Sequence, residues 1–94
     1  MQKWSPVLVT WGDAHGGDTG WMEPEDIKHE PEPVETIGLL WKHDNVGISL
    51  IMSKTSDDEV GGYMFIPAGM VMSIKPLQKE DGKNATLTDN RPLT

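Results

Sequence analysis

Apolar and polar side chains alternate near the start of the chain. In the segment from Val7 to Trp11, the residues Val7, Val9 and Trp11 fall on one face of an extended backbone. This period of two residues is typical of a strand that is buried on one side. The pattern therefore predicts a first strand over residues 6–12, with these three side chains directed toward a core.

A loop is predicted after this strand. Five of the eight residues at positions 13–20 are glycine or aspartate, residue types that favour turns. Pro24 and the acids beside it suit the first turn of a helix, which Pro31 and Pro33 would end quickly. We expect Trp21 to fold back onto the sheet as a lid over the core. The alternative is that its indole anchors a binding surface.

Two longer apolar segments predict the best-supported strand pairing in the chain. Strands over residues 35–42 and 46–53 are joined by the connection His43-Asp44-Asn45, whose length suits a hairpin. Each strand carries three apolar residues with a period of two. We therefore expect cross-strand packing between two sets of side chains: Ile37, Leu39 and Trp41, and Val46, Ile48 and Leu50.

A proline and a glycine separate the last two apolar segments, for which we predict strands over residues 62–66 and 70–75. Pro67 lacks the N–H that strand pairing needs, and Gly69 can take the positive φ of a sharp reversal. Strand pairing is therefore expected to stop at this corner and restart at a new angle. Such a one-turn corner between two strands is typical of small SH3-like barrels.

The predicted fold class is all-β, a small SH3-like five-stranded barrel. This single barrel domain is expected over residues 1–77, and a polar, non-periodic C-terminal tail over residues 78–94. Trp11 and Trp41 are expected in the core by alternation. The other residues expected to supply much of the core are Ile37, Leu39, Ile48, Leu50, Phe65, Ile66 and Val71. The methionines expected to fill gaps in it, in preference to forming a binding face, are Met52, Met64, Met70 and Met72.

Length and composition bound the possibilities further. A chain of 94 residues makes one domain, and an apolar fraction of 36% predicts a small core. The absence of cysteine agrees with a reducing compartment. No apolar segment approaches the roughly 20 residues that cross a bilayer, and residues 1–6 lack a signal-peptide pattern. We therefore expect a soluble protein of a reducing cytoplasm.

The formal net charge of −7 repels phosphates and anionic lipid surfaces, so direct binding to nucleic acid or to a membrane is not expected. Six acids cluster between residues 23 and 35, where Lys28 is their only basic neighbour. These acids are Glu23, Glu25, Asp26, Glu30, Glu32 and Glu35. The cluster has two interpretations, a solvated connection or an acidic face that meets a basic partner.

The sequence contains no recognisable catalytic motif. It lacks a Gly-x-Ser-x-Gly segment, a phosphate-binding loop and a metalloprotease helix motif. Asp13, His15, Asp18, His29 and Glu30 carry groups that can bind a metal, but their spacing matches no standard ligand pattern. We therefore expect no enzymatic activity, no cofactor and no metal site.

Several segments, taken together, resemble a family of small tailed-bacteriophage proteins without assigned chemistry. The family shares the motifs Trp-x-Asp-Ala, Gly-Trp and Ile-Pro-x-x-Met/Ile-Val. The matching segments here are Val7-Leu-Val-Thr-Trp-Gly-Asp-Ala14, Gly20-Trp21, Thr36-Ile-Gly-Leu-Leu40 and Ile66-Pro-Ala-Gly-Met-Val-Met-Ser-Ile74. The resemblance covers roughly residues 7–77. It implies a phage accessory gene that is expressed in a bacterial cytoplasm, and it brings no activity with it.

Three hypotheses about function follow. The leading one is a non-enzymatic phage accessory protein that binds a host protein and inhibits or redirects it, in host takeover or anti-defence. The residues expected to contact that partner are Asp13, Asp18, Trp21, Glu25, Asp26, Glu30 and Glu32. The second is a sponge that sequesters a small cyclic nucleotide, with Trp4, Trp21 and Tyr63 as candidates for an aromatic pocket. The third is a virion structural protein or an acidic DNA mimic. The second hypothesis would need an oligomer, and the oligomeric state itself stays open.

Overall fold

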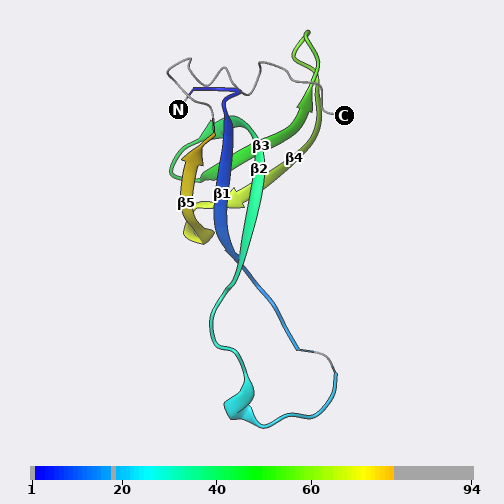
Figure 1. The fold of residues 1–94 in the computed structure, drawn as a ribbon, viewed down its shortest axis with the longest axis vertical. Coiled ribbons are helices and arrows are strands. Elements are labelled where there is room, and N and C mark those ends of the chain that lie inside the picture. Colours follow the sequence, from blue (N-terminus) through cyan, green and yellow to red (C-terminus); the bar gives the residue numbers. More distant parts are fainter. Residues whose placement is uncertain (1, 18, 78–94) are drawn as a thin grey trace, which may run out of the picture.

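The computed structural model describes residues 2–17 and 19–77. These residues form five strands and two short 3-10 turns (Figure 1). The strands are β1 (Pro6–Asp13), β2 (Glu32–His43), β3 (Gly47–Lys54), β4 (Val60–Pro67) and β5 (Val71–Pro76). The turns are η1 (Pro24–Asp26) and η2 (Ala68–Met70). The predicted all-β fold is confirmed, and each predicted strand is present with bounds shifted by a few residues.

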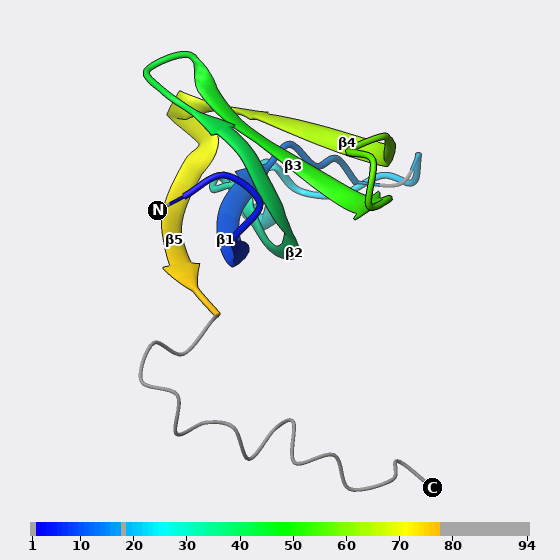
Figure 2. The ribbon, with the colours of Figure 1, turned by 90° about the horizontal axis from the view of Figure 1, so that it is seen from above.

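The strands form one antiparallel sheet in the order β4-β3-β2-β1-β5. Figure 1 shows the β3–β4 hairpin running obliquely across β1 and β2, and Figure 2 shows the same curved sheet from above. β4 and β5 are its two edges and do not pair with each other, so the described residues form an open sheet and not a closed barrel. The predicted tail, residues 78–94, lies outside the described residues.

One face of the sheet, here called the inner face, packs an aliphatic core. Val7 and Val9 of β1 are fully buried on it, as the alternation predicts. Ile48, Leu50 and Ile66 were expected in the core and are buried as well. Four other apolar side chains pack partly buried against this cluster: Trp11, Met70, Val71 and Ile74. The inner face therefore carries most of the burial that stabilises the fold.

The residues of β2 that face the core are not the ones that were expected there. Leu40 lies opposite Leu50 and is buried, whereas Leu39 lies opposite Ile51 and Ile37 is 63% exposed. The prediction that Ile37 and Leu39 form core contacts with β3 is therefore wrong. The pairing register decides this, because a shift of one residue moves every side chain of a strand to the other face.

Trp41 was also expected in the core, and this prediction is wrong. The register of β2 against β3 shifts between Leu40 and Lys42, as in a β-bulge, and Trp41 is the extra residue. A bulge places two residues of one strand opposite one residue of its partner. The indole of Trp41 is 46% exposed and lies on the outer face, on the same side of the sheet as Leu39 and Ile51.

The outer residues of β4 and several methionines are more exposed than expected. Phe65 lies opposite Ser49 on the outer face and is 45% exposed. Met52, Met64 and Met72 are exposed, so the expectation that they fill the core is wrong for them. Met64 and Met72 belong to the two edge strands, where no further strand covers their side chains.

The corner between the last two strands has the predicted length and a different backbone conformation. η2 makes a single 3-10 turn directly after Pro67. Gly69 lies within this turn and has no positive φ, so that part of the prediction is wrong. A 3-10 turn reverses the chain with right-handed torsion angles, which any residue can adopt. Among the described residues, the glycines with positive φ are Gly47, which pairs with Pro67, and Gly62, toward the other end of β4.

Candidate functional site

The segment between β1 and β2, residues 14–31, extends away from the sheet and is here called the projecting loop. Figure 1 shows it as a long excursion at the opposite end of the molecule from the N-terminus and the tip of the β3–β4 hairpin. All its described residues are exposed. The predicted helical turn is present as η1, with Pro24 at its first position. The projecting loop therefore adds surface to the molecule without adding to its core.

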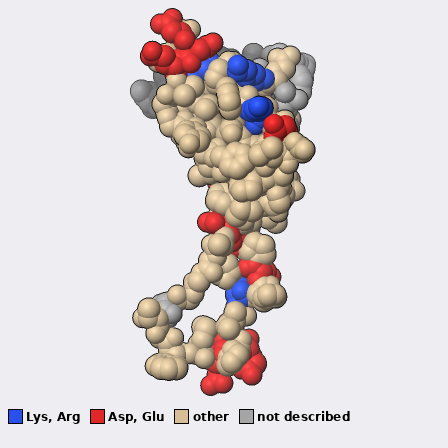
Figure 3. All heavy atoms as spheres, turned by 180° about the vertical axis from the view of Figure 1, so that it is seen from behind, with Lys and Arg blue, Asp and Glu red and all other residues tan. Residues whose placement is uncertain are grey.

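The charge of the projecting loop is acidic at its outer end. Figure 3 shows red carboxylates gathered there, with one blue side chain nearby, and a second group of carboxylates at the far end of the molecule. The Lys28 ammonium lies 3.5 Å from a carboxylate oxygen of Glu32, and both side chains are about half exposed. An exposed pair of this kind contributes little to stability. The remaining described acids of the loop are exposed to solvent.

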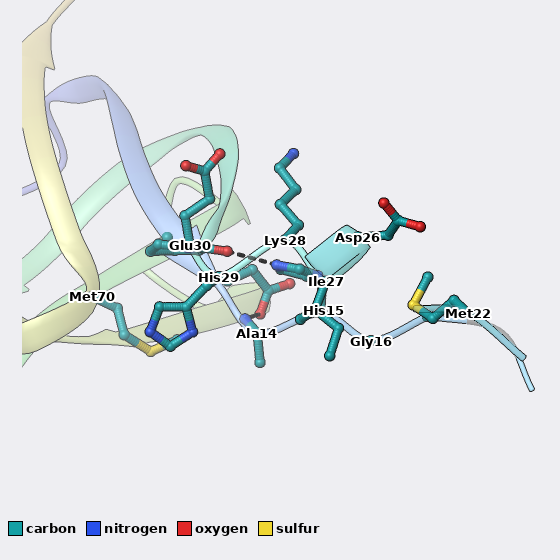
Figure 4. Close-up of a pocket in the computed structure, with 14 residues that line it drawn as sticks. Ala14, His15, Gly16, Met22, Asp26, Ile27, Lys28, His29, Glu30 and Met70 are labelled. Carbon is teal, nitrogen blue, oxygen red and sulfur yellow. Dashed lines mark hydrogen bonds between the residues drawn. The ribbon is translucent and has the colours of Figure 1, made fainter. Parts of the chain in front are cut away.

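A cavity of about 580 Å³ lies where the projecting loop meets the sheet. Figure 4 shows His15, His29 and Glu30 around it, with Met70 reaching in from the sheet. His15 Nε2 lies 2.6 Å from the backbone oxygen of Glu30, a hydrogen bond that ties the two legs of the loop together.

The structure brings part of the expected protein-binding set together. Asp13 and Glu32 are paired positions at the ends of β1 and β2, and Asp26 and Glu30 line the cavity with Asp13. Glu25 lies in η1 next to Asp26 but does not line the cavity. Asp18 lies outside the described residues.

Trp21 does not fold back onto the sheet, so that expectation is wrong. Its side chain is 102% exposed, and Met22 and Ile27 in the same loop are 54% and 59% exposed. The projecting loop, which carries Trp21, extends away from the sheet (Figure 1). Of the two interpretations of Trp21, a lid over the core is excluded, and an anchor on a binding surface stays a prediction.

A second concave site lies on the outer face of the sheet and is here called the aromatic pocket. Its volume is about 490 Å³, and its lining residues are Lys3, Trp4, Trp41, Ser49, Ile51, Asp58, Val60 and Tyr63. The structure thus joins Trp4 and Tyr63, two of the three residues expected for a nucleotide pocket. Trp21 lies in the projecting loop and is not part of it.

Trp41 is the aromatic lining residue that sequence reasoning missed. Its alternation with Ile37 and Leu39 does place the three side chains on one face, and the error was to assign that face to the core. Alternation is the same whichever face is buried, so only the pairing register could show that this face is the outer one.

Asp44 has a shifted pKa and anchors the turn between β2 and β3. Its Oδ1 accepts hydrogen bonds from the N–H of Val46 at 2.9 Å and of Gly47 at 3.4 Å. The bond from Val46 is the largest cause that holds the pKa of Asp44 below its ordinary value of 3.8. Desolvation opposes it, and the bond from Gly47 and the charges of Lys42 and His43 add to the lowering. This carboxylate stabilises a turn and faces neither concave site.

Across residues 2–17 and 19–77, no group of three or more His, Asp or Glu side chains is placed to hold a metal ion. No helix within the same residues is long and apolar enough to cross a membrane. Comparison with protein-family models, with curated proteins and with solved structures found no match to this chain.

Proposed function

We propose that this chain is a non-enzymatic, SH3-like binding module of a tailed bacteriophage that binds a basic host protein through the projecting loop. The observation that carries the proposal is Trp21, fully exposed in an acidic loop that stands away from the sheet. Exposed tryptophan is enriched among residues that dominate binding energy. Covering an apolar side chain of this size with a partner removes a large area from water, and this favours binding.

The SH3-like part of the proposal rests on topology. The first three loops join neighbouring antiparallel strands, a one-turn corner joins β4 to β5, and β5 returns to pair with β1. This order supports an SH3-like arrangement even though the sheet is open. Fold alone does not supply function, so the proposed activity rests on the loop and its side chains.

The charge of the loop supports a basic partner. The acids of the projecting loop and of its junction with β2 outnumber Lys28, and its carboxylates point into solvent at the outer end (Figure 3). Charges at the rim of an interface act mainly on the rate of encounter, while a desolvated aromatic anchor acts on the rate of dissociation. The two kinds of residue therefore make separable kinetic predictions.

The test begins with capture of partners from a bacterial lysate on the full chain, followed by binding kinetics with the purified partner. Replacing Glu25, Asp26, Glu30 and Glu32 together with lysine should slow association and change its salt dependence. Trp21→Ala should raise the dissociation rate. Both variants should keep the melting temperature of the parent, because the replaced side chains are exposed.

Matched controls are available at the other end of the molecule. Replacing Asp57 and Glu59 in the β3–β4 turn with lysine changes charge without touching the projecting loop, and Trp41→Ala removes a partly exposed indole from the outer face. If the loop variants bind the partner with the same association and dissociation rates as the parent, the projecting loop is not the surface used. The same holds if the controls weaken binding equally.

A further inference from the structure

The aromatic pocket is assembled from four separate parts of the chain. Trp4 comes from the segment before β1, Trp41 from the bulge in β2, Ile51 from β3 and Tyr63 from β4. Ile51 is 4% exposed and forms the floor, while Trp41 and Tyr63 are 46% and 73% exposed at the rim. Its volume of about 490 Å³ falls in the range of small-molecule sites, about 300–1,000 Å³.

Trp4 is held over this face at a conformational cost. Its φ is +71°, a left-handed conformation that is unfavourable for a bulky side chain. The N–H of Trp4 donates to the backbone oxygen of Leu40, and the N–H of Leu40 donates to that of Ser5 at 2.8 Å. Backbone bonds to β2 therefore fix the segment that presents the indole.

Two lysines lie beside this indole. The Nζ atoms of Lys3 and Lys54 lie 5.2 and 5.3 Å from the centre of the Trp4 ring. The ammonium of Lys54 is also paired with the Asp58 carboxylate at 3.1 Å. Lys3 has no carboxylate within salt-bridge distance among the described residues. Lys3 therefore supplies a positive charge that is available to a ligand.

We propose that the aromatic pocket binds a small nucleotide, whose base stacks on the aromatic side chains and whose phosphate meets Lys3. Every base has a flat π face that stacks on tryptophan or tyrosine, and a lysine ammonium suits a phosphate. The hydroxyl of Ser49 and the carboxylate of Asp58 line the same pocket and can accept hydrogen bonds from base N–H groups.

Charge favours a small ligand over a nucleic-acid strand. The net charge of the chain is −7, and a strand that runs across the molecule meets repulsion from its carboxylates. A mononucleotide or cyclic dinucleotide is small enough to place a phosphate at Lys3 without crossing the acidic projecting loop. A proline-rich peptide also suits aromatic grooves, but it offers nothing to the unpaired ammonium of Lys3.

The test is isothermal calorimetry of the full chain with AMP, GMP and cyclic di-AMP, each compared with adenosine and inorganic phosphate. Tyr63→Ala removes an exposed stacking ring and Lys3→Glu reverses the available charge, and both residues are exposed, so the fold survives both changes. Each variant should weaken nucleotide binding by roughly fivefold or more, the effect of losing one stacking or charge-assisted contact. The matched controls Trp21→Ala and Lys75→Glu should leave the Kd unchanged.

Three outcomes overturn the proposal. The first is no heat and no thermal stabilisation with any of the three nucleotides at millimolar concentration. The second is binding that Tyr63→Ala and Lys3→Glu leave intact, or that inorganic phosphate alone reproduces. The third is binding of a proline-rich peptide at the aromatic pocket in the absence of any nucleotide binding. Failure of the projecting loop to bind a protein partner has no bearing on these results.

Discussion

The two faces of the sheet are built from alternate residues of the same strands and have opposite characters. The inner face packs aliphatic side chains that are at most 4% exposed, and the described part of the chain buries no polar or charged residue there. The outer face carries the rings of Trp41, Tyr63 and Phe65, which are about half exposed or more, and the half-buried ring of Trp4, which has two lysines beside it. One face therefore stabilises the fold and the other is free to recognise a ligand.

This division separates the residues that stabilise the sheet from those that are available for binding. Most of the fold's burial is supplied by one face and its few aliphatic residues, so large apolar residues elsewhere are not needed for folding. Exposed aromatic residues that contribute little to stability are typical of binding surfaces. The projecting loop resembles the outer face in this respect, since its Trp21 is fully exposed and contributes no burial to the fold.

The strongest test of the division compares two aliphatic residues that the sequence placed in the same core. Leu50→Ala should lower the free energy of unfolding by about 2–5 kcal/mol, because it leaves a cavity among buried neighbours. Ile37→Ala should change it by less than about 0.5 kcal/mol, because Ile37 is 63% exposed. Chemical denaturation of both variants measures the difference. Equal losses would mean that the outer face stabilises the fold as much as the inner one.

The second test concerns Gly47, where β3 begins against β4. A methyl group at this position would meet the backbone oxygen of Ile66 and lie 2.7 Å from the ring of Phe65. Overpacking of a close approach costs about 1–3 kcal/mol, so Gly47→Ala should lower the midpoint of urea unfolding. Gly69→Ala is the matched control, because a Cβ there meets nothing within 4 Å. If both variants unfold at the same midpoint, the strands separate at little cost.

The third test addresses the one aromatic residue that belongs to the inner face of β1. Trp11 Nε1 donates a hydrogen bond of 3.0 Å to Thr36 Oγ1 on the paired strand β2. Thr36→Val keeps the shape of the side chain and leaves this partly buried donor without its acceptor, at a cost of about 1 kcal/mol. The loss should be visible as a lower melting temperature with unchanged secondary structure by circular dichroism. An unchanged melting temperature would show that water replaces the threonine oxygen.

The smallest expected effect is a pH dependence at Asp44. Because the folded state lowers its pKa below 3.8, the stabilisation is fully present above pH 3.8 and is lost as pH falls through the lower folded value. Asp44→Asn should therefore show a shallower loss of melting temperature in acid than the parent, and a slightly lower melting temperature at neutral pH. Asp57→Asn, in the turn of the other hairpin, is the control. If the melting temperatures of the parent and of Asp44→Asn fall in parallel as the pH is lowered, Asp44 does not contribute to the acid dependence of stability.

Several features of the fold could be predicted because local pattern determines them. Alternation identified the strands, turn residues identified the loops, and Pro67 marked the corner that joins β4 to β5. The candidate sites were predicted only in part. Trp4 and Tyr63 were named for one pocket, but their partner is Trp41, and Trp21 proved to be separate and fully exposed.

The sequence by itself determined which residues are extended and which side chains share a face, because a period of two residues is a local property of the strand. Only the tertiary structure decided which face is buried. Leu40 and Trp41 are neighbours in the chain and belong to opposite faces of β2, and the pairing of β2 with β3 decides that the face of Leu40 is buried and that the face of Trp41 is exposed to solvent. A register depends on contacts between distant residues, and the local pattern is the same for both choices.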